Sequence, residues 1–176
     1  MRRITLGVAV TLDGFIEGPN GEYDWCFTDQ DYGITEFSKQ VDALVMGRKT
    51  FDTMKGYEGP SPWSHAKTYV FSRTLKAAPG VEVLSGNVLE SMNHLRQQPG
   101  KDIWLFGGAD LAAQFSNHNL IDEYWLSVHP ILLGTGKPLF KNLADRKKLK
   151  LVESKTYATG LVSLRYQPDL AGLQTW

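Results

Sequence analysis

Three short stretches of the sequence combine glycine, cations and hydroxyl groups in a way that suits phosphate binding. They are Gly47-Arg48-Lys49-Thr50, Ser72-Arg73 and Gly107-Gly108-Ala109. Arginine offers a planar fork that matches phosphate oxygens, and Ser or Thr hydroxyls can bond to them. Glycine lets backbone N–H groups approach an anion closely, because it has no Cβ. Each stretch alone is a weak signal, since an Arg-Lys pair usually lies on a solvated surface and binds no ligand.

The Gly107-Gly108 pair lies between a predicted buried strand and a predicted helix. Residues 103–106 are four apolar residues in a row, and the spacing of Leu111 and Phe115 is typical of a helix. A strand that enters a helix through two glycines presents backbone N–H groups and the positive end of the helix dipole at one spot. The pair therefore predicts either a phosphate site or a tight turn, and this stretch alone leaves both open.

The same alternation of strand and helix runs through the first 120 residues. We predict strands at 4–10, 43–46, 67–71, 81–84, 103–106 and 121–128, helices at 29–40, from 47, at 87–97 and from 109, and a loop at 56–64. This alternation indicates an α/β protein with a mainly parallel sheet and helices on both faces, which is a three-layer α/β/α arrangement. Stretches 149–157 and 161–166 predict a C-terminal antiparallel hairpin.

All three phosphate-suited stretches directly follow predicted strands. In open parallel sheets, ligands bind beyond the carboxyl ends of the strands. We therefore expect the three stretches to meet at one edge of the sheet, where they favour a ligand rich in phosphate.

Composition excludes several other classes of protein. The 176 residues suit a single domain over 1–176, and 19 basic residues balance 19 acidic ones, which disfavours nucleic-acid binding. Cys26 is the only cysteine and the four histidines lack metal spacing, so we expect no disulfide and no metal site. No apolar run approaches the roughly 18 residues that span a bilayer. We expect a cytoplasmic protein with no membrane partner.

Two familiar nucleotide-binding motifs are also absent from the sequence. It contains neither a Gly-x-Gly-x-x-Gly run with a following acidic residue nor a Gly-x-x-x-x-Gly-Lys-Ser/Thr run. The usual Rossmann dinucleotide site and an ATPase phosphate loop are therefore not expected.

The order of the motifs resembles the dihydrofolate reductase fold. The resemblance rests on 46–51, Ser72-Arg73 and Gly107-Gly108, and extends to 8–10, 13–16 and Asp24-Trp25. The run from His129 to Phe140 is similar to one branch, the reductase domain of bacterial riboflavin biosynthesis and its stand-alone relatives. The resemblance covers about residues 3 to 167.

This resemblance implies that the cofactor is NADPH. The pyrophosphate would meet Gly107 and Gly108, the adenosine 2′-phosphate would meet the two arginines and Ser72, and segment 13–25 would cover the nicotinamide. The implied cofactor-binding residues are Ala9, Ile16, Gly47, Arg48, Lys49, Thr50, Ser72, Arg73, Gly107, Gly108 and Ala109. Independently, two arginines without an acidic residue at the 2′ position favour NADP over NAD.

The resemblance also suggests a pocket carboxylate. Asp31 lies at the matching offset before Met46, and Glu36 could serve instead. Either would be the catalytic residue beside the substrate. The alternative for Asp31 is a helix-terminal acid that complements the helix dipole.

Two departures weaken folate as the substrate. Ala112 stands where folate enzymes commonly have tyrosine, and 29–40 contains no arginine for a glutamyl tail. We therefore expect an NADPH-dependent reductase of a small heterocycle, most like 5-amino-6-(5-phosphoribosylamino)uracil reductase. The alternatives are a dihydrofolate reductase-type activity and a non-catalytic NADPH- or nucleotide-binding dimer. A homodimer is expected, with the strand from Ile121 and the loop at 133–138 as an edge that could pair between copies.

Overall fold

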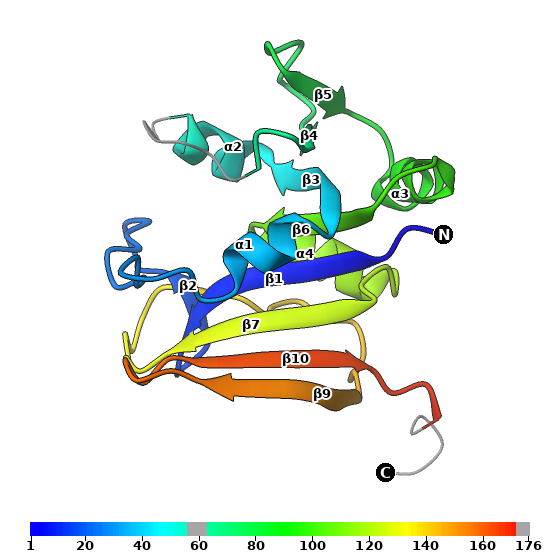
Figure 1. The fold of residues 1–176 in the computed structure, drawn as a ribbon. Coiled ribbons are helices and arrows are strands. Elements are labelled where there is room, and N and C mark those ends of the chain that lie inside the picture. Colours follow the sequence, from blue (N-terminus) through cyan, green and yellow to red (C-terminus); the bar gives the residue numbers. More distant parts are fainter. Residues whose placement is uncertain (56–62, 172–176) are drawn as a thin grey trace.

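An eight-stranded sheet forms the centre of the computed structural model, which describes residues 1–55 and 63–171 (Figure 1). The order of its strands is β5-β4-β3-β6-β1-β7-β10-β9. The strands are β1 Ile4–Thr11, β2 Phe15–Glu17, β3 Val41–Gly47, β4 Lys67–Phe71, β5 Val81–Leu84, β6 Asp102–Gly107, β7 Glu123–His129, β8 Lys137–Pro138, β9 Leu149–Thr156 and β10 Val162–Pro168. The helices are α1 Ile34–Ser38, α2 Arg48–Met54, α3 Val88–Gln97 and α4 Ala109–Asn117.

The pairing of the strands confirms the predicted fold class. Strands β5, β4, β3, β6, β1 and β7 pair in parallel, whereas β10 pairs antiparallel with β7 and with β9. The C-terminal hairpin is thus present where it was predicted. A small second sheet, in which β2 pairs antiparallel with β8, was not predicted, because strands of two or three residues carry no readable periodicity.

Helices cover both faces of the sheet and produce two apolar cores. On one face, α3 and α4 pack against the strands around the buried side chains of Leu105 and Phe115. On the other face, Phe37 of α1 lies edge-on against Trp104 and Trp125. Figure 1 shows α1 in front of the sheet and α4 behind it. Because both faces are covered, the central strands are apolar along nearly their whole length.

The first helix is shorter than predicted. The sequence suggested a helix over 29–40, but α1 spans only Ile34–Ser38. Tyr32 and Gly33 have φ angles of 49° and 88°, which are left-handed values. A right-handed helix cannot pass through two such residues, so it begins after them. Of the loop predicted at 56–64, residues 56–62 lie outside the described part of the chain.

The prediction that the strand from Ile121 forms an edge is wrong. This strand is β7, which lies inside the sheet between β1 and β10. The loop residues Lys137 and Pro138 pair with β2. An outer strand of the sheet is β9, on which Leu151 and Val152 are about half exposed. The homodimer stays a prediction.

Within the described residues, no helix combines the length and the apolar character that crossing a membrane requires.

Candidate functional site

The carboxyl ends of the parallel strands meet at one edge of the sheet. Gly47 is in register with Phe71 on β4, and Met46 is in register with Gly107 on β6. Thr11 and His129 are paired at the ends of β1 and β7. The three phosphate-suited stretches thus follow the ends of the adjacent strands β4, β3 and β6, as the sequence analysis expected.

The Gly107-Gly108 turn lies directly against α2. A Cβ atom on Gly108 would be 3.4 Å from Thr50 Oγ1, so that hydroxyl stands beside the bare glycine backbone. Gly107 has a φ angle of 114°, which side chains other than glycine rarely adopt, and the peptide bond between the two glycines is cis. The Gly107-Gly108 turn and the first turn of α2 therefore meet in one small region, which contains the Thr50 hydroxyl and little side-chain bulk.

Helices α2 and α4 both begin at a glycine without a side-chain cap. Gly47 precedes α2 and Gly108 precedes α4, and among the described residues neither start has a side chain that caps it. The first N–H groups of a helix have no partner within the helix, and they favour an anion. The nine-residue α4 therefore directs open N–H groups and a partial positive charge toward the end of β6.

Three cations of the predicted set surround this region. The Arg48 Nε–H donates to Asp52 Oδ2 at 2.6 Å, one helical turn along α2, while Lys49 and Arg73 are exposed. The hydrogen bond from Arg48 lowers the pKa of the Asp52 carboxyl. Asp52 was missed from the sequence, although its i,i+4 spacing from Arg48 is a readable signal. It orients Arg48 while the other guanidinium N–H groups can still contact a ligand.

The Ser72 hydroxyl has a local structural role. Its oxygen accepts hydrogen bonds from the backbone N–H groups of Thr74 at 3.2 Å and Leu75 at 2.9 Å. This arrangement shapes the turn that presents Arg73 after β4, and the same hydroxyl lies 3.5 Å from Thr74 Oγ1.

An acidic residue that the sequence analysis overlooked lies in the first turn of α4. Asp110 forms an ion pair with Lys141 at 2.7 Å. The hydrogen bond from Lys141 is the main reason that the pKa of Asp110 is lowered, and Lys137 and Lys49 add smaller electrostatic effects. Lysines from three segments thus lie near the start of α4.

The residues predicted beside the nicotinamide lie at the same edge. Ala9 on β1 is half-buried and in register with Ser127, and Ile16 is a half-buried residue of β2. The turn between β1 and β2 is fixed by Asp13, which accepts hydrogen bonds from the Thr11 hydroxyl at 2.6 Å and the Gly134 N–H at 2.7 Å. The segment that is expected to cover the cofactor is therefore attached to the loop after β7.

Asp31 stabilises the start of α1. Its two carboxylate oxygens accept hydrogen bonds from the N–H groups of Thr35 at 2.8 Å and Gly33 at 3.2 Å. The side chain of Thr35 is the main cause of the lowered pKa of Asp31. A carboxyl group with a lowered pKa is a poor proton donor near neutral pH. This geometry favours the alternative role as a helix-terminal acid, and the catalytic role stays a prediction.

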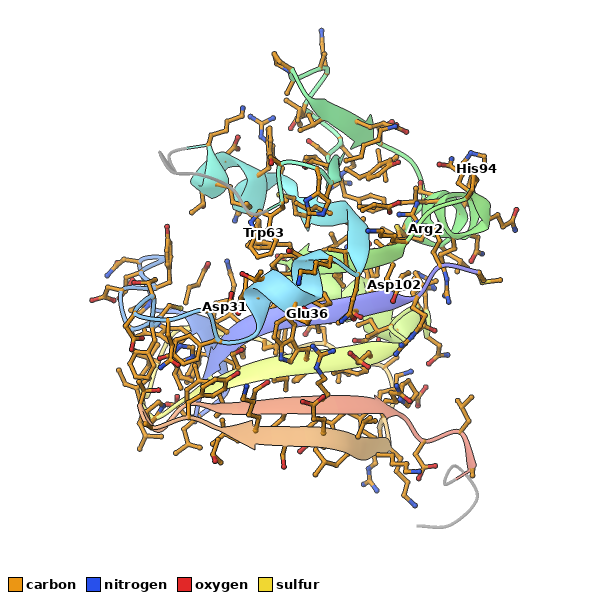
Figure 2. All side chains as sticks on the ribbon, in the orientation of Figure 1. Arg2, Asp31, Glu36, Trp63, His94 and Asp102 are labelled. Atoms are coloured by element: carbon orange, nitrogen blue, oxygen red, sulfur yellow. The ribbon has the colours of Figure 1, made fainter. Side chains whose placement is uncertain are left out.

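Glu36 is exposed and paired with Lys39 at 2.9 Å. Figure 2 shows Asp31 at the end of α1 nearer the carboxyl ends of the strands, and Glu36 further from them. Arg2 and Asp102 lie toward the other edge of the sheet, close to α3. Among the described residues, neither Asp31 nor Glu36 contacts the Gly107-Gly108 turn.

An aromatic cluster at the end of β7 was not predicted as part of the site. His129 is 3% exposed, and the rings of Trp25 and Phe27 lie 5.2 Å and 5.0 Å from it. Both ring nitrogens of His129 have hydrogen-bond partners. By contrast, the buried Trp25 Nε1–H has no hydrogen-bond partner among the described residues. A buried donor without an acceptor is costly, so it marks a place where a ligand oxygen would fit.

Comparisons with known proteins agree with this arrangement. The family model described as RibD C-terminal domain matches residues 2–163. The chain is 48% identical to the Bacillus subtilis (strain 168) protein YyaP over 177 aligned positions, which cover 94% of each chain. It is 29% identical to the riboflavin biosynthesis protein RibD of Corynebacterium ammoniagenes, over 76% of this chain and 44% of RibD.

A solved structure has the same fold. The crystal structure of "Putative riboflavin biosynthesis protein" from Shewanella sp. PV-4 superposes with a TM-score of 0.85 and 27% identity. The superposition covers 96% of this chain and 99% of the Shewanella chain. The similarity therefore extends over all the elements that build the carboxyl edge.

Proposed function

The chain belongs to the RibD C-terminal domain family, and on that premise we propose that it is an NADPH-dependent reductase of a small heterocyclic substrate. The substrate would be of the 5-amino-6-(5-phosphoribosylamino)uracil type. Membership of this family supports an oxidoreductase. The choice of NADPH and of the heterocycle is our proposal, and it rests on the residues at the carboxyl edge.

The observation that carries the proposal is the pair of open helix starts at Gly47 and Gly108, with Thr50 beside Gly108. A Cβ at Gly108 would take up space against the Thr50 hydroxyl, so this backbone is shaped for close approach. The residues present therefore fit a dinucleotide. Gly107, Gly108 and Thr50 would hold the pyrophosphate, and Arg48 with Arg73 would hold the 2′-phosphate.

NADPH, when bound, supplies the hydride, and the protein positions the reactants and excludes water. Ala9 and Ile16 would form the surface beside the nicotinamide. The Trp25 N–H would donate to an oxygen of the substrate ring, because it has no acceptor of its own among the described residues. Ala112 is buried inside α4 with 1% exposure, so it offers no contact to a folate, and this supports the heterocycle over dihydrofolate.

A second candidate is a dinucleotide-binding protein without turnover. It is favoured by one observation, which is that both predicted proton donors are engaged elsewhere, Asp31 at the start of α1 and Glu36 with Lys39. A reductase of this kind needs another proton source, such as water.

Titration of the protein with NADPH and with NADH tests both candidates, with tryptophan fluorescence as the signal. We expect tighter binding of NADPH. Arg48→Ala should weaken NADPH binding by about tenfold or more and leave NADH binding nearly unchanged, because a charge-assisted bond to the 2′-phosphate is lost. Lys76→Ala, at an exposed position after Arg73, serves as the matched control.

Three outcomes decide between these ideas. If neither dinucleotide binds, both candidates fail. If Arg48→Ala weakens both dinucleotides equally, Arg48 does not contact the 2′-phosphate. Oxidation of NADPH in the presence of the phosphoribosylaminouracil separates the reductase from the protein that only binds.

A further inference from the structure

Beyond β2, one hydrogen bond among the described residues attaches segment 18–28, which contains part of the expected covering segment 13–25, to the sheet. Residues 18–28 connect β2 to the approach of α1, and their other recorded hydrogen bonds stay inside the segment, such as Gly18 N–H to Glu22 O and Cys26 N–H to Tyr23 O. Within the described part of the chain, the bond from the Phe27 N–H to His129 Nε2, at 3.1 Å, is the one that joins this segment to the rest of the fold.

The geometry fixes the protonation state of His129. Its Nδ1 lies 2.9 Å from the Ser127 carbonyl oxygen, which can only accept, so Nδ1 carries a hydrogen. Its Nε2 faces a backbone N–H and must therefore be the acceptor. The ring is thus neutral. A second proton, on Nε2, would face the Phe27 N–H, and the bond would be lost.

The surroundings of the ring contain no charged partner in the described residues. Trp25 and Phe27 cover it, and the carbonyl groups of Ser127 and Val10 are its polar neighbours. Burial lowers the pKa of His129 below its ordinary value of 6.5. The neutral ring is therefore the form present at neutral pH.

The titratable groups on the segments that pack near His129 bond to other residues, carry no charge or are exposed to solvent. Asp13, after β1, bonds Thr11 and Gly134, and Asp29 accepts from the Tyr32 hydroxyl at 2.7 Å. Cys26 stays a neutral thiol, since burial raises its pKa to about 11. Asp24 is exposed. None of these groups forms an ion pair with His129 among the described residues, so protonation of the ring would find no compensating carboxylate.

We propose that His129 is a positioning residue that anchors segment 18–28 through Phe27, and that protonation of His129 releases the segment. At pH values above the pKa of His129 the segment is held over the carboxyl edge, and at lower pH values it opens. The anchoring stands on the hydrogen bonds alone. Its consequence for ligand binding rests on the proposed function, because that function puts the dinucleotide under this segment.

Amide hydrogen exchange of Phe27, measured by NMR on the intact protein at about pH 7.5 and about pH 5, tests the anchor directly. After correction for intrinsic exchange rates, we expect protection of this amide to fall about fivefold or more at the lower pH, in step with the titration of the His129 ring. His129→Gln keeps an acceptor near the position of Nε2, so protection should persist and lose its pH dependence. His129→Phe should lose protection at both values, with thermal unfolding recorded to show that it is folded.

The control is His118→Gln, because His118 is an exposed histidine at the end of α4. It should behave like the wild type. Equal Phe27 protection at both pH values in the wild type, or a pH dependence that survives in His129→Gln, would overturn the proposal. In NADPH titrations of the same samples, binding should weaken more at the lower pH in the wild type and in His118→Gln than in His129→Gln. Absence of NADPH binding together with normal Phe27 behaviour refutes the proposed function and leaves the anchor intact.

Discussion

The four helices begin in two different ways. At α1 and α3 the chain supplies its own acceptor, since Asp31 accepts from Thr35 and Gly33, and Asn87 accepts from the N–H groups of the first turn of α3. A glycine precedes α1 as well as α2 and α4, but at α2 and α4 no side chain among the described residues accepts a hydrogen bond from the start of the helix.

Under the proposed function, this difference separates helix starts with a structural role from the two that would contact the cofactor. A side-chain cap stabilises a helix start by about 1 kcal/mol relative to alanine and by only a few tenths relative to glycine, so the glycines at α2 and α4 leave these N–H groups open at little cost. The two open starts are those that follow the neighbouring strands β3 and β6, which lie at the centre of the carboxyl edge. An anion bound there, as the proposed function requires, would satisfy these open N–H groups. The following predictions test this division, beginning with the largest expected effect.

Closing an open start should block the cofactor. Gly47→Asp would place a carboxylate where no atom lies within 4 Å of the new Cβ, on a backbone with φ −79° and ψ 163° that suits a capping residue. We expect NADPH binding to weaken by roughly tenfold to a hundredfold, because the carboxylate repels phosphate. Thermal stability should stay the same or rise. Gly47→Asn is the matched control, because it caps without charge. Unchanged NADPH affinity in Gly47→Asp would remove the start of α2 from the cofactor site.

Removing a self-supplied cap should affect stability alone. In Asn87→Ala, α3 loses the acceptor that bonds Leu89 N–H at 2.8 Å and Glu90 N–H at 3.2 Å. We expect a loss of about 1 kcal/mol in the free energy of unfolding, measured by urea denaturation. The affinity for NADPH should not change. A weaker affinity in this variant would mean that the two kinds of helix start are not functionally separate.

The smallest effect concerns Asp31 and its pH dependence. Because the pKa of Asp31 is lower in the folded protein than its ordinary value, its carboxylate stabilises the fold above the ordinary pKa, and this contribution disappears as pH falls through the folded value. Asp31→Asn should therefore be slightly less stable than the wild type at neutral pH, and the difference should shrink in acid. Denaturation at several pH values measures it. A large loss of NADPH oxidation in Asp31→Asn, with stability unchanged, would instead restore Asp31 as a catalytic residue.

The sequence was sufficient to predict the sheet, since its strands are long enough to show their apolar character. Residues 67–71 and 81–84 were placed as strands with the observed bounds. The start of α1 could not be placed, because the left-handed backbone at Tyr32 leaves no mark in the amphipathic pattern. The position of β7 inside the sheet depends on which strands pair over long distances, and a single sequence does not specify this.

The residues of the candidate site also divide into those that the sequence indicates and those that it does not. Gly47, Gly108 and Arg48 were identified because residue type and proximity to a strand end are both visible in the sequence. Asp52, the partner of Arg48, lies in the same helix at the i,i+4 position, so this contact was readable from the sequence. The cluster of Trp25, Phe27 and His129 depends on how loops pack. Loop packing follows no short period, so no sequence pattern indicated this cluster.

The position of β1 has a consequence for how the chain assembles. Its neighbours in the sheet are β6 and β7, and Leu6 is in register with Leu105 and Tyr124. Strand β1 is synthesised before both of its partners, so it must wait for the chain beyond residue 123 before it gains the second of them. Contacts of such long sequence separation slow folding, because the loop between them must close before they form. During that interval at least one edge of the apolar strand β1 is unpaired, so the nascent chain is exposed to aggregation until β7 emerges.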